Sequence, residues 1–350
     1  MVPGPVDFTE DHLTLGKVAH FPRPSGYEPQ LAGVYSTGAN VHRGQDKLLV
    51  SEVQFLARAH AERACAFPGV AVDSPFLCVY AGACPCLHLH ELLRMFPNVV
   101  FVLVDPAFEA AGLVAGQPTW DPGRVVVWPE EFDAQGVDIL VSWLQRRAIR
   151  SGTHHMRSVP PRHLPYFERL GQLRLVDFEA REDVLFISDI RVHPLDEDRI
   201  ARDMDLQALW FHQLQASSGL LKFRLPYVTD GWLAQSGEHG GERWYLEGEV
   251  YLPVWGPRST TECRLRVERG CGVCAYDPVS HERRLAGFNR YERQGTFRWK
   301  GADFESFDAA ATAAVATQYQ EHVQMVADCC ARLPTAHGAP EPGLAPPPPP

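Results

Sequence analysis

Short hydrophobic runs alternate along the chain with segments in which hydrophobic residues recur at helical spacing. Nearly continuous apolar runs occupy residues 75–83, 98–106, 124–131, 183–192 and 219–227, which is typical of strands buried on both faces. Residues 47–64 carry Leu49, Val53, Leu56 and Ala57 on one helical stripe, and further helices are predicted at 87–96, 201–218 and 307–333. Strands that alternate with helices in this way predict an α/β fold, with a central, mostly parallel sheet flanked by helices.

The pattern also predicts how the chain is divided. Residues 1–35, rich in Pro and Gly, are expected to form an N-terminal arm, and residues 36–333 a single domain. The segment 136–180 is longer than a crossover between parallel strands requires, which predicts an insertion there. Residues 334–350 end in a run of prolines, so we expect this C-terminal tail to be disordered or extended.

Composition narrows the class of protein. Hydrophobic residues make up 45% and charged residues 22% of the 350 residues, as in soluble globular proteins. The sequence contains no apolar run long enough to span a membrane and no N-terminal signal peptide. Nine cysteines, an odd number, are scattered or adjacent, which favours reduced thiols. We therefore predict a cytoplasmic protein with no membrane partner.

The charge distribution bears on nucleic-acid binding. The formal net charge of −10 argues against non-specific binding of nucleic acid over the whole surface. Residues 257–300, however, contain ten basic and five acidic side chains. This stretch is a solvated mixed surface or a local anion-binding face.

Polar and small residues follow four of the predicted strands. Tyr80 to Ala83 follow the first strand, Asp105 the second, Glu130 the third and Asp189 the fourth. Ligands of open parallel sheets bind at the carboxyl ends of the strands, and an acid after the second strand can accept both hydroxyls of a ribose. Each signal is weak alone, because Asp also caps turns. Neither GxGxxG nor GxxxxGK[ST] is present, so the pattern favours an adenosine-containing ligand of another kind.

Two lysines and two acids stand out from their surroundings. Lys47 precedes the stripe of the first helix, Asp189 ends a strand, Lys222 interrupts an apolar strand, and Glu262 begins the strand-like 261–267. Each alone is more simply a solvent-facing charge. As a set, they suggest acid–base chemistry, because a buried lysine beside a second ammonium loses its proton more readily while carboxylates hold it in place.

In the same order, these motifs resemble a known family. "GYEP", "GQDKLLVSE", "VYAGACPCLHLHEL", "LVDP", "ISDIR", "LLKFRLPY", "TTECRL" and "HERRLAGFN" lie between Tyr27 and Asn289. They are similar to motifs of the poxvirus cap-specific mRNA (nucleoside-2′-O-)methyltransferases, which are also the small subunits of viral poly(A) polymerases. The resemblance implies a Rossmann-like methyltransferase fold, S-adenosyl-L-methionine as cofactor, and a large DNA virus as the source.

The resemblance assigns roles residue by residue. Lys222 would be the base on the ribose 2′-hydroxyl, with Asp189, Lys47 and Glu262 completing the catalytic set. The positions that match the family's cofactor residues are Gln45, Tyr80, Gly82, His88, Asp105, Asp189 and Arg191. Two positions depart from the family: Cys86 stands where it has a glycine and Ala107 where it has an arginine. Cys86 is kept in the cofactor set, and Glu130 or Arg191 could compensate for the arginine.

For the 7-methylguanosine cap, the resemblance implies stacking between Tyr27 and Tyr227 and hydrogen bonds to Glu282. A cationic ring between two tyrosines is a favourable cation–π arrangement. The family has an acid at Thr229 and a tyrosine at Ser259. Asp230 and Trp255 are nearby substitutes for these side chains.

The expected partners are capped mRNA and a poly(A) polymerase catalytic subunit. No metal is expected, because "CGVC" at 271–274 lacks a second pair at suitable spacing. Two alternatives stay open: methylation of a base or a protein, and a non-catalytic or dual-role RNA-binding processivity subunit of a poly(A) polymerase. The Lys-Asp-Lys-Glu set argues against the first and against a purely structural role.

Overall fold

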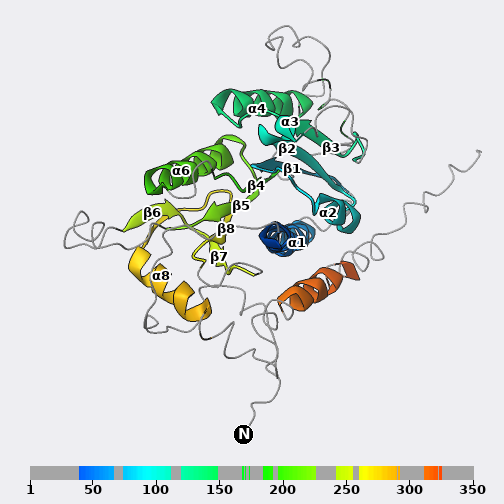
Figure 1. Cartoon of the computed structure of the whole chain (residues 1–350). Helices are drawn as coiled ribbons and strands as arrows, with labels where there is room; N and C mark the ends of the chain where they lie inside the picture. The colour runs from blue at the N-terminus through cyan, green and yellow to red at the C-terminus, as the bar shows by residue number, and fades with distance from the viewer. Residues whose placement is uncertain are drawn as a thin grey trace, which may run out of the picture.

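The computed structural model describes most of the predicted domain (Figure 1). The described residues are 39–66, 74–111, 120–148, 168, 170, 173, 184–191, 196–225, 242–254, 260–289, 291, 311–321, 323 and 324. The predicted arm and the Pro-rich tail lie outside them.

A seven-stranded sheet with the order β3-β2-β1-β4-β5-β8-β7 forms the centre of the fold. Its strands are β1 (Phe76–Ala81), β2 (Val99–Val104), β3 (Val125–Trp128), β4 (Val184–Ser188), β5 (Ser218–Phe223), β7 (Glu249–Tyr251) and β8 (Cys263–Glu268). The first five run parallel, whereas β8 is antiparallel to both β5 and β7. The α/β, Rossmann-like class predicted from the sequence is confirmed.

The strands form because their residues are apolar on both faces. Every residue of β1, β2 and β4 is buried, as expected for a parallel sheet covered on both sides. Figure 1 shows α4 (Ala134–Ala148) and α6 (Glu197–Gln213) on one face of the sheet, and α1 (Ala39–Ala66) and α2 (Leu89–Met95) on the other. The core therefore lies in two layers around the sheet.

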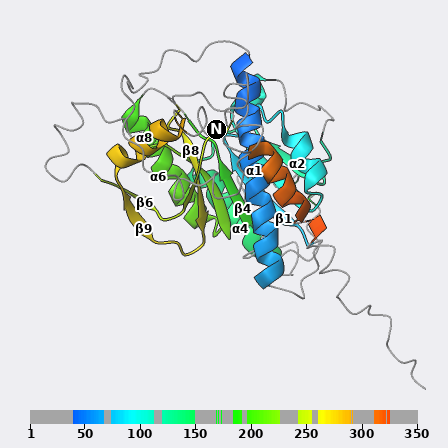
Figure 2. The same ribbon diagram turned by 90° about the horizontal axis from the view of Figure 1, so that it is seen from below.

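Helix α1 is the longest element and lies across the sheet (Figure 2). The predicted stripe is largely buried: Val53, Leu56 and Ala57 are at most 4% exposed, and Leu49 packs against the core. The helix at residues 311–321, within the predicted C-terminal helix, lies beside α1 in Figure 2. Tyr319 from this helix donates a hydrogen bond to the carbonyl of Met95 in α2.

Two boundaries differ from the sequence pattern. Helix α6 begins at Glu197 rather than 201, because the side chain of Asp196 accepts a hydrogen bond from the backbone amide of Arg199 and so caps the helix. It ends at Gln213, and Gln215 adopts a φ of 53° just before β5. A polar cap and a left-handed residue thus set limits that hydrophobic spacing alone does not reveal.

The predicted insertion at 136–180 begins with an ordinary crossover helix. Helix α4 packs Val137 and Leu140 into the core. The residues after α4 and before β4 lie outside the description, except Glu168, Leu170 and Leu173.

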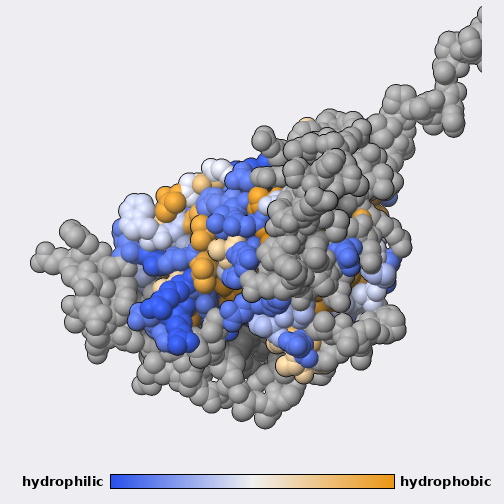
Figure 3. Space-filling view, turned by 90° about the horizontal axis from the view of Figure 1, so that it is seen from above, coloured by the Kyte–Doolittle hydropathy of each residue, from blue (hydrophilic) through white to orange (hydrophobic). Residues whose placement is uncertain are grey.

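Smaller elements complete the fold. Helix α3 (Ala107–Ala110) follows β2, strands β6 (Arg243–Leu246) and β9 (Val273–Tyr276) form a two-stranded antiparallel sheet, and α8 (Pro278–Gly287) follows β9. On the face in Figure 3, the described residues are mainly hydrophilic around a narrow hydrophobic band. In the part of the chain that the structure describes, no helix has the length and apolar character needed to cross a membrane.

Candidate active site

The site begins where the order of the strands reverses, between the central parallel strands β1 and β4. The amide of Asp189 donates to the carbonyl of Ala81 at 2.9 Å, so the ends of these strands are joined. Gly82 follows β1 with a φ of 73°, and a Cβ on it would lie only 2.7 Å from the amide nitrogen of Ile190. Only glycine fits this close approach without strain. Such a switch point is where ligands of open α/β sheets bind.

The loop after β1 is held by Asp105 at the end of β2. One carboxylate oxygen of Asp105 accepts from the amide of Cys84 at 3.1 Å, and the other from the amide of Ala107 at 2.8 Å. Cys86 adopts a φ of 48°, so at the position of the family's glycine the backbone is left-handed, as a glycine would allow. The thiol of Cys86 is buried in the core, and burial raises its pKa well above the ordinary value.

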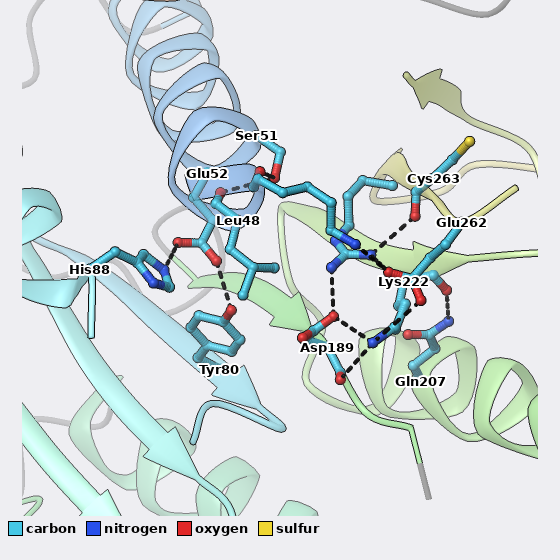
Figure 4. A network of polar contacts seen from close by, with 12 residues as sticks. Leu48, Ser51, Glu52, Tyr80, His88, Asp189, Gln207, Lys222, Glu262 and Cys263 are labelled. Atoms are coloured by element: carbon cyan, nitrogen blue, oxygen red, sulfur yellow. Dashed lines mark hydrogen bonds and ion pairs between the residues drawn. The ribbon is translucent and has the colours of Figure 1, made fainter. Parts of the chain in front are cut away.

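The structure brings the four predicted catalytic residues into one cluster (Figure 4). Lys222 Nζ lies 2.9 Å from Asp189 Oδ1 and 3.5 Å from Glu262 Oε2. Lys47 Nζ, from α1, lies 2.5 Å from Glu262 Oε1. The side chains are only 11–19% exposed. Residues separated by up to 215 positions therefore form one mostly buried network of ion pairs.

Arg264 is a fifth charged member of this cluster that the sequence reasoning missed. Its guanidinium lies 2.6 Å from Asp189 Oδ1 and 3.3 Å from Glu262 Oε1. The signal was available, because side chains alternate along a strand and Arg264 stands two residues after Glu262, on the same face. The five side chains carry three formal positive and two negative charges.

The charges of the cluster shift one another's protonation. Burial lowers the pKa of Lys47, and the positive charges of Arg264 and Lys222 add to this against the attraction of Glu262. Burial alone would raise the pKa of Glu262, but Lys222, Lys47 and Arg264 hold it well below its ordinary value. The pKa of Asp189 is likewise lowered, because Lys222 and Arg264 outweigh burial. Both acids are therefore ionised at neutral pH.

A second polar network connects α1 to the loop after β1 (Figure 4). Glu52, fully buried, accepts from the hydroxyl of Tyr80 at 2.7 Å and faces Nε2 of His88 at 2.7 Å. Nδ1 of His88 lies 2.9 Å from Oε1 of Gln45, which also accepts from the amide of Leu87. The sequence reasoning named Gln45, Tyr80 and His88 but missed Glu52, whose signal is an acid between Leu49 and Leu56 in the apolar stripe.

Two other residues of the predicted cofactor set lie at the ends of β3 and β4. Glu130 accepts from the indole nitrogen of Trp128 at 3.4 Å. Arg191 lies toward α6, with Nη1 4.0 Å from Asp203 Oδ2. Its guanidinium is nearly buried, and its Nη atoms make no hydrogen bond among the described residues. Arg191 is thus on the β5 side of Asp189, away from Asp105, and its geometry gives no support to an adenosine contact.

Of the predicted cap-binding residues, only Glu282 is described. It lies in α8 and is 6% exposed. Tyr27 and Tyr227 lie outside the described residues, as do Thr229, Asp230, Trp255 and Ser259. The predicted pair of stacking rings therefore stays a prediction.

A pocket opens beside the Lys47–Glu262 ion pair, between α1, the end of β7 and the start of β8. It is a small depression, with a cavity volume of only about 10 Å³. Apolar side chains of Val50, Tyr251 and Val254 line it together with the charged groups. In the sheet order, this pocket lies on the opposite side of the cluster from Asp105.

Metal-binding groups are sparse in the described part of the chain. No group of three or more His, Cys, Asp or Glu side chains there could hold a metal ion. Cys271 and Cys274 of the "CGVC" sequence are free thiols.

Comparison with known proteins gives little further information. No protein-family model matches the chain, and no curated protein sequence matches it. Among solved structures, it is similar to the 16S rRNA (adenine(1408)-N(1))-methyltransferase of Catenulisporales acidiphilia, a variant solved with its cosubstrate SAM. The two are 15% identical, with a TM-score of 0.27 over 62% of this chain and 93% of the other. Because this similarity is so low, the functional argument rests on the site itself.

Proposed function

We propose that the protein is an S-adenosylmethionine-dependent methyltransferase that methylates the ribose 2′-hydroxyl of the nucleotide next to a 7-methylguanosine cap. The observation that carries this proposal is the cluster of Lys47, Asp189, Lys222 and Glu262 directly beside the switch point of the sheet. Two lysines held between two ionised acids suit proton removal from an alcohol. Methylation of an amine or a ring nitrogen has no evident need for this arrangement.

The residues around the switch point fit S-adenosylmethionine. Gly82 lets the loop after β1 pack directly against the backbone of Ile190 at this point, where a Cβ would collide. Each carboxylate oxygen of Asp105 has one backbone donor, and its remaining lone pairs can accept the hydroxyls of a ribose. Gln45, Tyr80 and His88 stand along the same loop. When bound, the cofactor would supply an electrophilic methyl group.

Lys222 would act on the acceptor hydroxyl. Its amine lies between Asp189 and Glu262, which orient it. The cluster holds three basic and two acidic side chains, and burial lowers the pKa of the neighbouring Lys47. A neutral Lys222 Nζ can take the proton of a 2′-hydroxyl placed beside it. Holding this hydroxyl in line with the methyl group would contribute much of the rate.

For the cap, the family resemblance assigns hydrogen bonds from the nitrogen edge of guanine to Glu282, which is buried on α8. The stacking roles of Tyr27 and Tyr227 rest on the family resemblance. Association with a poly(A) polymerase catalytic subunit and a location in the host cytoplasm or virion are further proposals from the same resemblance.

The decisive experiment is methyl transfer from labelled S-adenosylmethionine to short RNAs that differ only at the 5′ end. We expect labelling of RNA with a methylated cap, and digestion should place the label on the first 2′-oxygen. Label on a base would exclude ribose methylation, and equal labelling of capped and uncapped RNA would remove cap specificity. A protein that binds the cofactor but labels no RNA would leave the processivity role as the better reading.

A further inference from the structure

We propose that Glu52 is a positioning residue that couples the loop after β1 (residues 82–88, called the cofactor loop below) to the catalytic lysine Lys47 through helix α1. This inference rests on the proposed function of the site, and it assigns a role to a side chain outside the predicted catalytic and cofactor sets. Among the described residues, the Glu52 carboxylate bonds to Tyr80 and His88 rather than to the clustered catalytic residues, so it acts through these two side chains.

Helix α1 presents two functional faces. Gln45 and Glu52 are seven residues apart, close to two helical turns, and both contact the segment that follows β1. Lys47 lies between them in sequence and pairs with Glu262. Figure 4 shows Glu52 with Tyr80 and His88 on one side of the helix and Glu262 on the other. One rigid helix therefore holds the loop with one face and the catalytic cluster with the other.

The contacts of Glu52 leave it little freedom. Its side chain is fully buried, and each carboxylate oxygen has its own partner at 2.7 Å. Burial, followed by the nearby Glu52 charge, raises the pKa of Tyr80 well above its ordinary value. The Tyr80 hydroxyl therefore stays protonated and acts as the hydrogen-bond donor to Glu52. A buried carboxylate without these donors would be strongly unfavourable. The loop must therefore stay on the helix for Glu52 to stay buried.

The Glu52–His88 contact also holds a proton. Nδ1 of His88 faces Oε1 of Gln45, an oxygen that already accepts from Leu87, so Nδ1 is best assigned as a donor. At 2.7 Å, Nε2 and the carboxylate need one proton between them, because two lone pairs would repel. A glutamine at position 52 could replace this arrangement, donating to a neutral Nε2 and accepting from Tyr80. A leucine could do neither.

The test is cofactor binding by Glu52→Leu and Glu52→Gln, measured by calorimetry with S-adenosylmethionine and with S-adenosylhomocysteine. Glu62→Leu is the matched control, since Glu62 is another acid of α1 but pairs with Arg58 and Arg266. We expect Glu52→Leu to raise the dissociation constant about tenfold or more, and Glu52→Gln to restore it to within about threefold. Glu62→Leu should lower the unfolding temperature without changing cofactor affinity.

Equal cofactor affinity of folded Glu52→Leu and wild type would overturn the proposal. If Glu52→Leu does not fold, amide hydrogen exchange of the wild-type protein tests the coupling between the loop and α1 instead. Added S-adenosylmethionine should slow amide exchange in α1 around residues 45–52 as well as in the loop, and protection confined to the loop would contradict the coupling.

The outcomes separate this inference from the proposed function, since binding is measured without RNA. If cofactor affinity depends on Glu52 but no capped RNA is labelled, the positioning role of Glu52 is supported and capped RNA is excluded as the substrate. A wild-type protein that binds no S-adenosylmethionine would lose both.

Discussion

Lys222 and Arg264 face each other across β5 and β8, and both reach the same oxygen of Asp189. Lys222 Nζ lies 2.9 Å and Arg264 Nη2 2.6 Å from Asp189 Oδ1, and the two residues are paired in the antiparallel register. Two cations that share one carboxylate oxygen repel each other at close range. Arg264 stays charged under all ordinary conditions. It therefore fixes Asp189 and adds positive charge beside the proposed base.

The first prediction concerns Arg264→Met. Loss of the guanidinium removes the shortest contact of Asp189, so the carboxylate that orients Lys222 is held less firmly. We expect kcat for methyl transfer to fall at least ~10-fold at neutral pH, because the base loses its position. Arg266→Met is the matched control, because Arg266 is equally buried on the same strand but pairs with Glu62 and Glu268. If both folded variants lose activity equally, the loss comes from a general disturbance of β8, and the specific role of Arg264 is excluded.

A second prediction separates a base from a surface charge at Lys222. If this lysine takes the proton, Lys222→Met should lower the rate of methyl transfer by ~100-fold or more while leaving cofactor binding intact. Asp189 and Glu262 keep Arg264 and Lys47 as partners, so the variant should fold. Single-turnover assays and calorimetry on the same preparation measure the two properties. Near wild-type turnover of Lys222→Met would end the proposed mechanism.

The sequence predicted the fold well because its strands are apolar on both faces, a pattern that local reading detects. It also grouped Lys47, Asp189, Lys222 and Glu262, since Lys47 and Glu262 begin, Asp189 ends and Lys222 interrupts an apolar segment, and the structure brings these four side chains together. Arg264 and Glu52 were missed for a physical reason. The local pattern could show that each side chain faces inward, but their partners lie 75 and 28 residues away in the chain, and only the folded structure reveals them. The direction of Arg191, toward α6, likewise follows from packing.

Asp105 gives a third prediction. Removal of its carboxylate in Asp105→Ala should weaken binding of S-adenosylmethionine and S-adenosylhomocysteine by about 10- to 100-fold, because hydrogen bonds to a charged acceptor are lost. Asp121→Ala is the control, since Asp121 also accepts from a backbone amide, that of Gly123, but precedes β3. Calorimetry on both variants gives the comparison. Unchanged affinity in folded Asp105→Ala would show that the ribose does not bind there.

The acids of the cluster predict how stability depends on pH. The pKa of Glu262 is held well below its ordinary 4.5, so the folded state binds fewer protons than the unfolded state. The stabilisation from Glu262 is thus complete above about pH 4.5 and is lost as the pH falls through the lowered value.

Glu262→Gln tests this linkage. At about pH 7, the variant should be less stable by ~2 kcal/mol, a value reduced from that of a fully buried pair because the side chain is partly exposed. The difference from wild type should shrink as the pH is lowered from 4.5, as measured by urea unfolding at several pH values. A difference that stays constant across the acid range would mean that Glu262 carries no such linkage.

Gly82 and Gly270 provide the last prediction, because they share a backbone conformation but not their surroundings. Their φ angles are 73° and 79°, so an alanine at either position is strained by about 1 kcal/mol. A Cβ on Gly270 would meet nothing within 4 Å, whereas on Gly82 it would lie 2.8 Å from the carbonyl carbon of Asp189. Gly82→Ala must therefore also move backbone, and we expect a total cost of about 3 kcal/mol.

The same displacement reaches the catalytic cluster. Since Gly82 contacts the backbone of Asp189, a shift there changes the position of the carboxylate that holds Lys222. Gly82→Ala should thus lose both cofactor affinity and methyl transfer, and Gly270→Ala neither, when each is measured on folded protein below its unfolding temperature. If Gly82→Ala loses stability but keeps both activities, then the tight junction of β1 and β4 supports the fold alone, and the ligand must bind elsewhere on the sheet edge.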